Sequence, residues 1–323
     1  MAKKKYSRRM KKIEPSVLRM TFTVPNGTSY IDLGLAASIA NRRGYSQQVL
    51  FPVDRMEFYT SAPGNFTVSK LPDTWMMRAA YEKTRALWNK MNDQVLDDEP
   101  SIKGKYHDFK ILMDIGQSTA TVETSSNLAG TILTPRDAGG NLTNADYALP
   151  GVSPRADWVY SQLTLPNDPT SGVTTDYTIH AVGPDTPASK GVIQGYAQSR
   201  SRPQSQDPNV PTNSGWMTEL FDVGEQLEEL RDIIEEDNDR PPYAVSPEQT
   251  ANNFYPGGAQ EFPGLQLHAF ETVSTTTVGG RTVAPGGVFM CGLMKIENTT
   301  GAGANLILQL VPGYHRGYLC EEL

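Results

Sequence analysis

The sequence has little cysteine and no long apolar run, and each absence excludes a class of protein. Two cysteines, Cys291 and Cys320, occur in 323 residues, so we expect two free thiols and no disulfide framework. The longest apolar runs, Leu33–Ala40 and Val288–Met294, fall far short of the ~18–20 residues that cross a bilayer. No apolar segment follows the basic first twelve residues, as it would in a signal peptide. We therefore expect a chain that is made in the cytoplasm and not secreted.

Motifs for nucleotide, zinc and serine-hydrolase chemistry are also absent. The sequence contains no phosphate loop of the Gly-x4-Gly-Lys-Ser/Thr type, no His-Glu-x-x-His and no Cys-x-x-Cys. The segment Gly151–Arg155 departs from Gly-x-Ser-x-Gly at its last position. Four scattered histidines are expected to be structural or solvent-facing: His107, His180, His268 and His315. The sequence thus predicts no catalytic residue, no metal site, no cofactor and no small-molecule substrate, and we do not expect an enzyme.

Charge is distributed unevenly along the chain, whose net charge is −7. Residues 1–12 contain seven basic residues and no acidic one: Lys3, Lys4, Lys5, Arg8, Arg9, Lys11 and Lys12. The remainder then holds 22 basic and 36 acidic residues, a net charge of −14. Such an arm attracts the phosphates of DNA or of anionic lipid headgroups, whereas the acidic body does not. We predict that residues 1–17 form an arm that faces a membrane or a genome.

The pattern of apolar residues predicts many short strands and two helices. Gly and Pro together make up 51 of 323 residues, above the roughly 12% of average proteins, which favours a fold rich in turns. Helices are predicted from Asp73, as N-cap, to about Leu96 and from about Ser214 to Glu236, each with an apolar stripe. The predicted strands are Leu18–Pro25, Ser29–Leu35, Gln48–Thr60, Phe66–Ser69, Asp108–Asp114, Trp158–Pro166, Asp176–Val182, Gly191–Ser199, Leu265–Val273, Val288–Glu297 and Leu306–Val311.

Two short matches at one spacing suggest a duplicated module. Thr23–Asn26 resembles Thr164–Asn167, and Trp75–Met76 matches Trp216–Met217, both at an offset of 141 residues. Each copy would contain strands, one helix and more strands, which favours antiparallel sandwiches over βαβ units. We therefore predict an all-β double jelly roll of two eight-stranded sandwiches. The predicted boundaries are 18–156 for the first jelly roll and 157–323 for the second.

Two stretches resemble a family of viral proteins. The opening MAKKKYSRRMKKIEPSVLRMTFTVPNGTSYIDL and the segment VSKLPDTWMMRAAYEKTRALWNKMNDQVLDDEPSIKGKYHDFKILMD are similar to major capsid proteins of small circular single-stranded DNA viruses of bacteria, the finnlakevirus-like phages with an internal membrane. The resemblance covers about residues 1–115. It implies a double jelly-roll capsid protein whose trimers form pseudo-hexagonal tiles of an icosahedral shell.

These observations together predict a virion protein that assembles with itself. Its expected partners are further copies of the chain, minor capsid proteins, and anionic lipid headgroups or viral DNA through the arm. One alternative is a carbohydrate- or surface-binding β-sandwich protein. Others are a single jelly-roll capsid protein with a projecting domain and a sandwich enzyme such as a glycoside hydrolase, although no spacing singles out a carboxylate pair.

Overall fold

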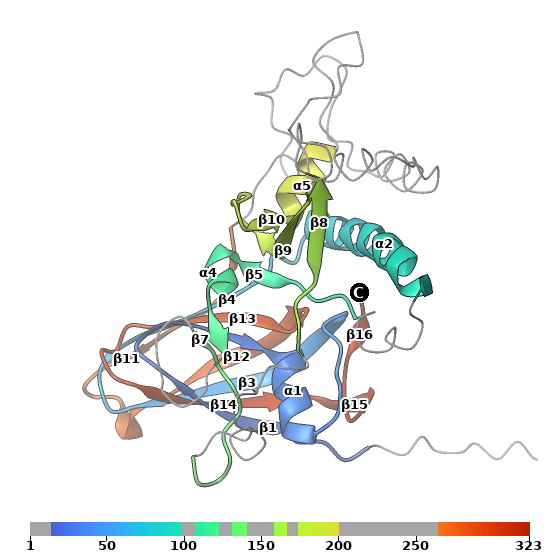
Figure 1. Ribbon diagram of the computed structural model, residues 1–323. Coiled ribbons are helices and arrows are strands. Elements are labelled where there is room, and N and C mark those ends of the chain that lie inside the picture. The colour runs from blue at the N-terminus through green and yellow to red at the C-terminus, as the bar shows by residue number, and fades with distance from the viewer. Residues whose placement is uncertain (1–13, 99–107, 123–130, 141–157, 167–173, 200–263) are drawn as a thin grey trace, which may run out of the picture.

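Strands dominate the structure. The computed structural model describes residues 14–98, 108–122, 131–140, 158–166, 174–199 and 264–323. Within these ranges the chain is mostly β-sheet with few helices, which confirms the all-β class (Figure 1). The predicted helix at 214–236 lies outside the described residues.

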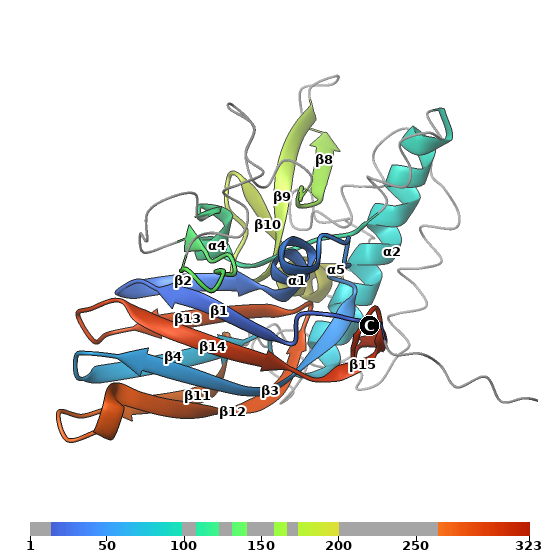
Figure 2. The ribbon, with the colours of Figure 1, turned by 90° about the horizontal axis from the view of Figure 1, so that it is seen from below.

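Eight antiparallel strands form two sheets that pack face to face (Figures 1 and 2). The first sheet runs in the order β1 (Arg19–Val24), β14 (Ala304–Leu310), β3 (Val49–Thr60) and β12 (Arg281–Met290), with β16 (Glu321–Glu322) added beside β3. The second runs in the order β11 (Gln266–Val273), β4 (Gly64–Lys70), β13 (Leu293–Asn298) and β2 (Gly27–Asp32), followed by β7 (Thr131–Ile132) and β6 (Thr121–Val122).

The order of these strands is that of one jelly roll. Counted along the chain, the eight long strands lie in the orders 1-8-3-6 and 5-4-7-2, so two Greek keys form a single sandwich. Its first four strands come from residues 19–70 and its last four from residues 266–310. This pairing corrects the expected double jelly roll, because strands on both sides of the predicted boundary at 156/157 belong to the same two sheets.

The two halves of the apparent repeat lie in different structural settings. Thr23 and Val24 end β1, which pairs with β14 in the sandwich. Thr164 and Leu165 lie in β8, which pairs with β9 outside the sandwich. A shared Pro-Asn turn signal therefore accounts for this match without a duplicated fold. The second match involves Trp216, which lies outside the described residues.

Alternation along the strands builds the sandwich core. Met20, Phe22 and Val24 are buried, and the threonines between them are half-buried. Phe58 and Phe66 stack with ring centroids 4.5 Å apart, which joins the two sheets. Further fully buried side chains of β3, β4, β12, β13 and β14 belong to the same core: Phe51, Met56, Val68, Phe289, Ile296, Leu306 and Leu308.

A short helix follows β2 where a continuing strand was predicted. α1 (Leu33–Asn41) begins after Asp32, whose carboxylate accepts a hydrogen bond from the Leu35 amide at 3.2 Å. This side-chain cap stops the strand at Asp32, because it favours the helical turn that follows. The prediction of a strand over Ser29–Leu35 is therefore wrong in its last three residues.

Between β4 and β11 the chain leaves the sandwich to form an inserted unit. Its described elements are α2 (Trp75–Asp98), β5 (Leu112–Asp114), α4 (Ile115–Ser118), β8 (Gln162–Pro166), β9 (Thr174–Val182), β10 (Ser189–Gly191) and α5 (Val192–Ser199). β9 pairs with β5, β8 and β10 in a small mixed sheet. The strand predicted over Gly191–Ser199 is wrong, since this segment is the helix α5 and packs against α2 and β9.

The long helix α2 confirms the first predicted helix but begins with a different cap. The hydroxyl of Thr74 accepts a hydrogen bond from the Met77 amide at 3.3 Å, whereas the carboxylate of Asp73 forms an ion pair with Arg78 at 3.1 Å. Thr74 is thus the capping residue, one position after the predicted Asp73.

Replacing Thr74 with alanine is expected to lower the free energy of unfolding by about 1 kcal/mol, because an amide at the start of α2 loses its acceptor. The matched variant Asp73→Ala removes only an exposed ion pair and should change stability by less than about 0.5 kcal/mol. Urea unfolding of both variants measures the difference. A larger loss for Asp73→Ala would show that Asp73 supplies the cap.

A tight turn divides the segment predicted as one strand, Val288–Glu297, into β12 of the first sheet and β13 of the second. The amide of Gly292 donates to the carbonyl of Phe289 at 3.1 Å and closes the turn. Cys291 and Gly292 both have positive φ, 55° and 66°. Cysteine rarely adopts this conformation, so local sequence gives little indication of a turn. The Cys291 side chain is fully buried.

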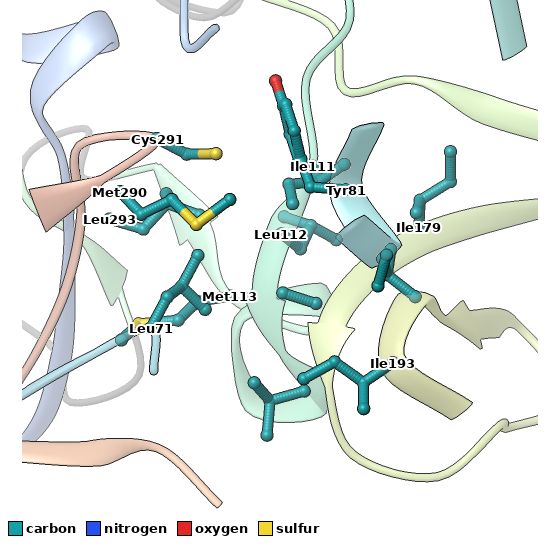
Figure 3. Packing of buried hydrophobic residues seen from close by; sticks show 14 of the residues in the cluster. Leu71, Tyr81, Ile111, Leu112, Met113, Ile179, Ile193, Met290, Cys291 and Leu293 are labelled. Carbon is teal, nitrogen blue, oxygen red and sulfur yellow. The ribbon is translucent and has the colours of Figure 1, made fainter. Parts of the chain in front are cut away.

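A second apolar core joins the inserted unit to one end of the sandwich. Figure 3 shows Met290, Cys291 and Leu293, around the β12–β13 turn, on one side and Ile179 and Ile193 of the inserted unit on the other. The segment of residues 111–113 lies between them (Figure 3). Because these side chains are almost fully buried, the unit is fixed against the sandwich.

A buried carboxylate links the same two parts. The Oδ2 of Asp32, at the start of α1, accepts hydrogen bonds from Gln47 at 2.7 Å and from Trp158 and Tyr160 at 3.1 Å. The side-chain oxygen of Gln47 in turn accepts the amide of Ile111 at 2.9 Å. Burial raises the pKa of Asp32 to about 6, although the four donors that face it act in the opposite direction.

Candidate assembly surface

The seven basic residues that were predicted to contact lipid or DNA lie outside the described residues: Lys3, Lys4, Lys5, Arg8, Arg9, Lys11 and Lys12. The structure locates the point where the arm joins the folded chain. Two contacts fix the backbone of Val17 just before β1: its amide donates to Asn41 at 2.8 Å, and its carbonyl accepts from Tyr318 at 2.7 Å. Ser16 also donates to the carbonyl of Gly317 at 3.2 Å. The arm therefore leaves from a fixed site.

Three arginines lie near this site. Arg43 forms an ion pair with Glu14, and the guanidinium of Arg316 donates to the carbonyl of Gly44. Arg42 follows α1 in a left-handed conformation, with φ of 54°. Three arginines thus lie close to the point where the arm joins the fold, with Glu14 paired to one of them.

One edge of the sandwich is covered by the chain itself. β7 pairs in parallel with β2, where Tyr30 lies opposite Ile132. The backbone carbonyl of Tyr30 accepts a hydrogen bond from the amide of Leu133 at 2.7 Å. The chain then crosses to the other sheet, and the amide of Arg136 donates to the carbonyl of Thr21 in β1 at 2.7 Å. Residues 131–136 therefore occupy hydrogen-bonding groups that would otherwise be exposed on edge strands.

At the opposite edge of the sandwich, formed by β11 and β12, the described residues add no further strand. Within the described residues each of these strands pairs with one neighbour in its sheet, β11 with β4 and β12 with β3. Figure 2 shows them at the margin away from β1 and β2. Five of the nine exposed large apolar side chains of the described residues lie on β11, on β12 or on the connection between them: Leu267 (59% exposed), Phe270 (57%), Val278 (93%), Val283 (41%) and Val288 (42%). We call these five residues the apolar edge.

The backbone of the β11–β12 edge is poorly suited to pairing with another strand. The register of β11 shifts between Leu267 and Ala269, which leaves His268 in a bulge with its Nε2 3.1 Å from the carbonyl of Pro285. Pro285 itself lies within β12 and has no amide hydrogen. Bulges and prolines protect edge strands from unwanted pairing. The backbone of this edge is therefore a poor template for an added strand.

A charged cluster borders the apolar edge on the outer face of the first sheet. The side chain of Glu57 is 7% exposed and lies 3.2 Å from Arg55 and 3.3 Å from Arg281. The hydroxyl of Tyr59 also donates to this carboxylate at 2.8 Å. The Tyr59 hydrogen bond and the two guanidinium groups hold the pKa of Glu57 below its usual value. Arg281 and Arg55 thus have a partner within the chain.

The described residues bring together no catalytic constellation. They contain no group of three or more His, Cys, Asp or Glu side chains that could hold a metal ion. His180 is fully buried in β9, where burial lowers its pKa, and both its ring nitrogens lack a side-chain or backbone hydrogen bond of good geometry. His268 and His315 are only partly buried, and His107 lies outside the described residues. Cys291 and Cys320 are both unpaired thiols.

No helix among the described residues is both long and apolar enough to span a membrane. Comparison with known proteins gives no further assignment: no protein-family model, no curated protein and no solved structure matches this chain. The apolar edge was not identified from the sequence, because alternation in β11 predicts a strand without indicating which face is buried. The functional argument therefore rests on the fold and on these surfaces.

Proposed function

We propose that this chain is the shell-forming subunit of a viral capsid, a single jelly roll with an inserted unit and a basic N-terminal arm. Jelly rolls serve as capsid and lectin domains, so the fold is compatible with this role without establishing it. The observation that carries the proposal is a difference between the two edges of the sandwich. The chain covers one edge with its own residues 131–136 and leaves apolar side chains on the other. Exposed apolar side chains on the outer faces of both sheets are therefore available to a neighbouring subunit at this edge.

The N-terminal arm supports the same role. It joins the fold beside α1, close to Arg42, Arg43 and Arg316, and its seven cationic residues suit an anionic surface inside a shell. We propose viral DNA or anionic lipid headgroups as its partner, and minor capsid proteins as further partners in the virion. The resemblance of residues 1–115 to capsid proteins of single-stranded DNA bacteriophages favours this assignment over a carbohydrate-binding sandwich or an enzyme.

The expected geometry of the tile changes with the fold. A trimer imitates a hexagon when each chain supplies two similar lobes, and the described residues build one sandwich. We therefore propose shell assembly through repeated contacts between single jelly rolls, and we do not carry forward the pseudo-hexagonal trimer.

Negative-stain electron microscopy and light scattering of the purified full chain test the proposal. We expect closed shells or regular capsomers that grow with protein concentration. A carbohydrate-binding module or an enzyme would remain a monomer or small oligomer under the same conditions. Particles that stay monomeric at every salt concentration and pH at which the protein is folded would contradict the proposal.

Deleting residues 2–12 is expected to leave the fold unchanged and to abolish binding to polyanions, because all seven charges of the arm are removed. For single-stranded DNA, seven phosphate contacts give a slope of about −5 in a plot of log K against log salt concentration. Fluorescence anisotropy with a labelled oligonucleotide and co-sedimentation with phosphatidylserine vesicles measure the two candidate partners. Equal binding by the full and truncated chains would show that the arm is not the contact.

A further inference from the structure

A cleft of about 620 Å³ lies at the end of the sandwich opposite the point where the arm joins. The β3–β4 and β11–β12 connections form its walls, together with the start of β14, at the left end of the sandwich in Figure 1. Its volume is within the range of about 300–1,000 Å³ that is typical of small-molecule sites. The assembly proposal makes no use of this cleft.

The chemistry of the cleft is neutral and rich in hydroxyl groups. None of the thirteen residues that line it carries a charge, although 20% of the chain is charged. The side chains of Ser61, Thr275 and Asn305 are exposed and form no hydrogen bond within the described part of the chain. Two hydroxyls and one amide thus remain available to a ligand, as donors and as acceptors. Such a set suits a ligand that is itself neutral and bears many hydroxyl groups.

An aromatic ring lies beside these polar groups. Tyr59 lines the cleft, and Asn305 is its partner in the sheet register. The Tyr59 hydroxyl donates to Glu57 at 2.8 Å, which holds the ring in place. A fixed aromatic side chain next to a few convergent polar groups is the common composition of a ligand pocket. The ring offers an apolar surface to the C–H groups of a sugar.

The β11–β12 wall of the cleft is held rigidly. Gly280 has φ of 59°, and a Cβ atom at this position would lie 1.9 Å from the carbonyl oxygen of Thr60. The connection therefore packs directly on the end of β3, which only glycine permits. Within the same connection, the Thr277 hydroxyl accepts the amide of Ser274 at 2.9 Å and the Thr277 amide donates to the Ser274 carbonyl at 3.0 Å.

The neighbouring connections are fastened to one another as well. The side-chain amide of Asn298 donates to the carbonyls of Pro25 at 3.1 Å and Ala302 at 2.8 Å. The amide of Gly301 donates to the side chain of Asn26 at 3.0 Å. Loops that are ordered before binding lose less conformational entropy when a ligand arrives. The cleft is therefore formed in the absence of a ligand.

We propose that this cleft binds a neutral oligosaccharide. The ligand contacts Asn305, Ser61 and Thr275 through its hydroxyl groups, and one sugar ring lies against Tyr59. The site does not depend on shell formation, because every residue that lines it belongs to one chain. It is accessible in the unassembled subunit, which allows it to be tested separately from the assembly proposal.

Glycine positions offer a matched pair of variants for the test. A Cβ atom on Gly303, which lines the cleft, would have its nearest contact at 3.9 Å from the Val24 carbonyl, and a Cβ atom on Gly44, at the opposite end, would meet nothing within 4 Å. Neither glycine has positive φ, so Gly303→Trp and Gly44→Trp are both expected to fold. Only Gly303→Trp places an indole in the cleft.

Titration calorimetry with the unassembled full chain measures binding of maltohexaose, cellohexaose and laminarihexaose up to about 10 mM, with a heparin hexasaccharide as the charged comparison. We expect at least one neutral glycan to bind the wild type. Gly303→Trp should lower its affinity at least about tenfold and Asn305→Ala several-fold, whereas the control Gly44→Trp should bind as the wild type does. Failure of all three neutral glycans to bind, equal binding by Gly303→Trp, or preference for heparin would overturn the proposal. None of these outcomes bears on whether the chain forms shells.

Discussion

Replacing Asp32 with alanine is expected to lower the free energy of unfolding at pH 7 by about 3 kcal/mol. The substitution removes the acceptor of four buried donors: the amide of Leu35 and the side chains of Gln47, Trp158 and Tyr160. A buried donor without a partner costs about 1–3 kcal/mol, and these donors have little access to water. Denaturant unfolding, monitored by tryptophan fluorescence, measures the loss.

The loss of stability in Asp32→Ala is also expected to depend on pH, and the raised pKa of Asp32 gives the sign of that dependence. The folded protein holds this proton up to about pH 6, whereas the unfolded chain releases it near the ordinary value of 3.8. Between these values the folded state binds more protons, so the contribution of Asp32 to stability falls as pH rises and is constant above about pH 6. The difference in stability between the wild type and Asp32→Ala should therefore widen from pH 7 to pH 4, by an amount on the order of 2 kcal/mol.

The variant Asp32→Asn serves as the control for this titration. It keeps the size of the side chain and carries no charge at any pH, so its difference from Asp32→Ala should not vary between pH 4 and pH 7. If the gap between wild type and Asp32→Ala instead narrows on acidification, the four donors outweigh burial and keep Asp32 ionised.

The second large effect is expected on assembly. Replacing Leu267 and Phe270 together with aspartate places two charges on the apolar edge, where a neighbouring subunit would exclude water from them. We expect complete loss of shells in electron micrographs. The melting temperature should change by no more than a few degrees, because both side chains are more than half exposed in the single chain.

Val159 provides the matched control for the edge variant. It is 53% exposed, apolar and located in the inserted unit, away from β11 and β12. Val159→Asp should assemble as the wild type does. Normal shells from the double edge variant would show that subunits meet elsewhere, and loss of shells from both variants would show a general sensitivity to added acidic charge.

Local sequence patterns predicted many of the strands and missed elements that depend on a single residue. Alternation in segments such as Leu18–Pro25 and Gln48–Thr60 was sufficient to find β1 and β3, because one side of each strand is buried in the sandwich. α1 was missed because its sequence is an apolar run that also suits a strand, and the residue that starts the helix is the buried cap Asp32. The β12–β13 turn was missed because Cys291, which has φ of 55° there, is not a residue type that signals a turn.

The assembly of these elements into one sandwich could not be predicted from local patterns. An alternating pattern shows that a segment is a strand but does not identify the strand it pairs with. The pairing of β1 with β14 therefore could not be predicted from either segment. A coincidental match at one spacing was then sufficient to suggest two sandwiches. The arm was recognisable from its charge alone, whereas the apolar edge and the neutral cleft depend on which strands lie at the margins and ends of the sheets.

The placement of the inserted unit has a consequence for synthesis of the protein. Lys70, at the end of β4, and Gln266, at the start of β11, are direct neighbours in the sheet, although the whole inserted unit separates them along the chain. The ribosome therefore synthesises β1 to β4 long before the strands β11 to β14 with which they pair. β1 has no neighbour in its sheet until β14 has been made. Until residues 266–310 have been synthesised, the first four strands expose unpaired edges and apolar faces, so the unfinished chain is prone to aggregate.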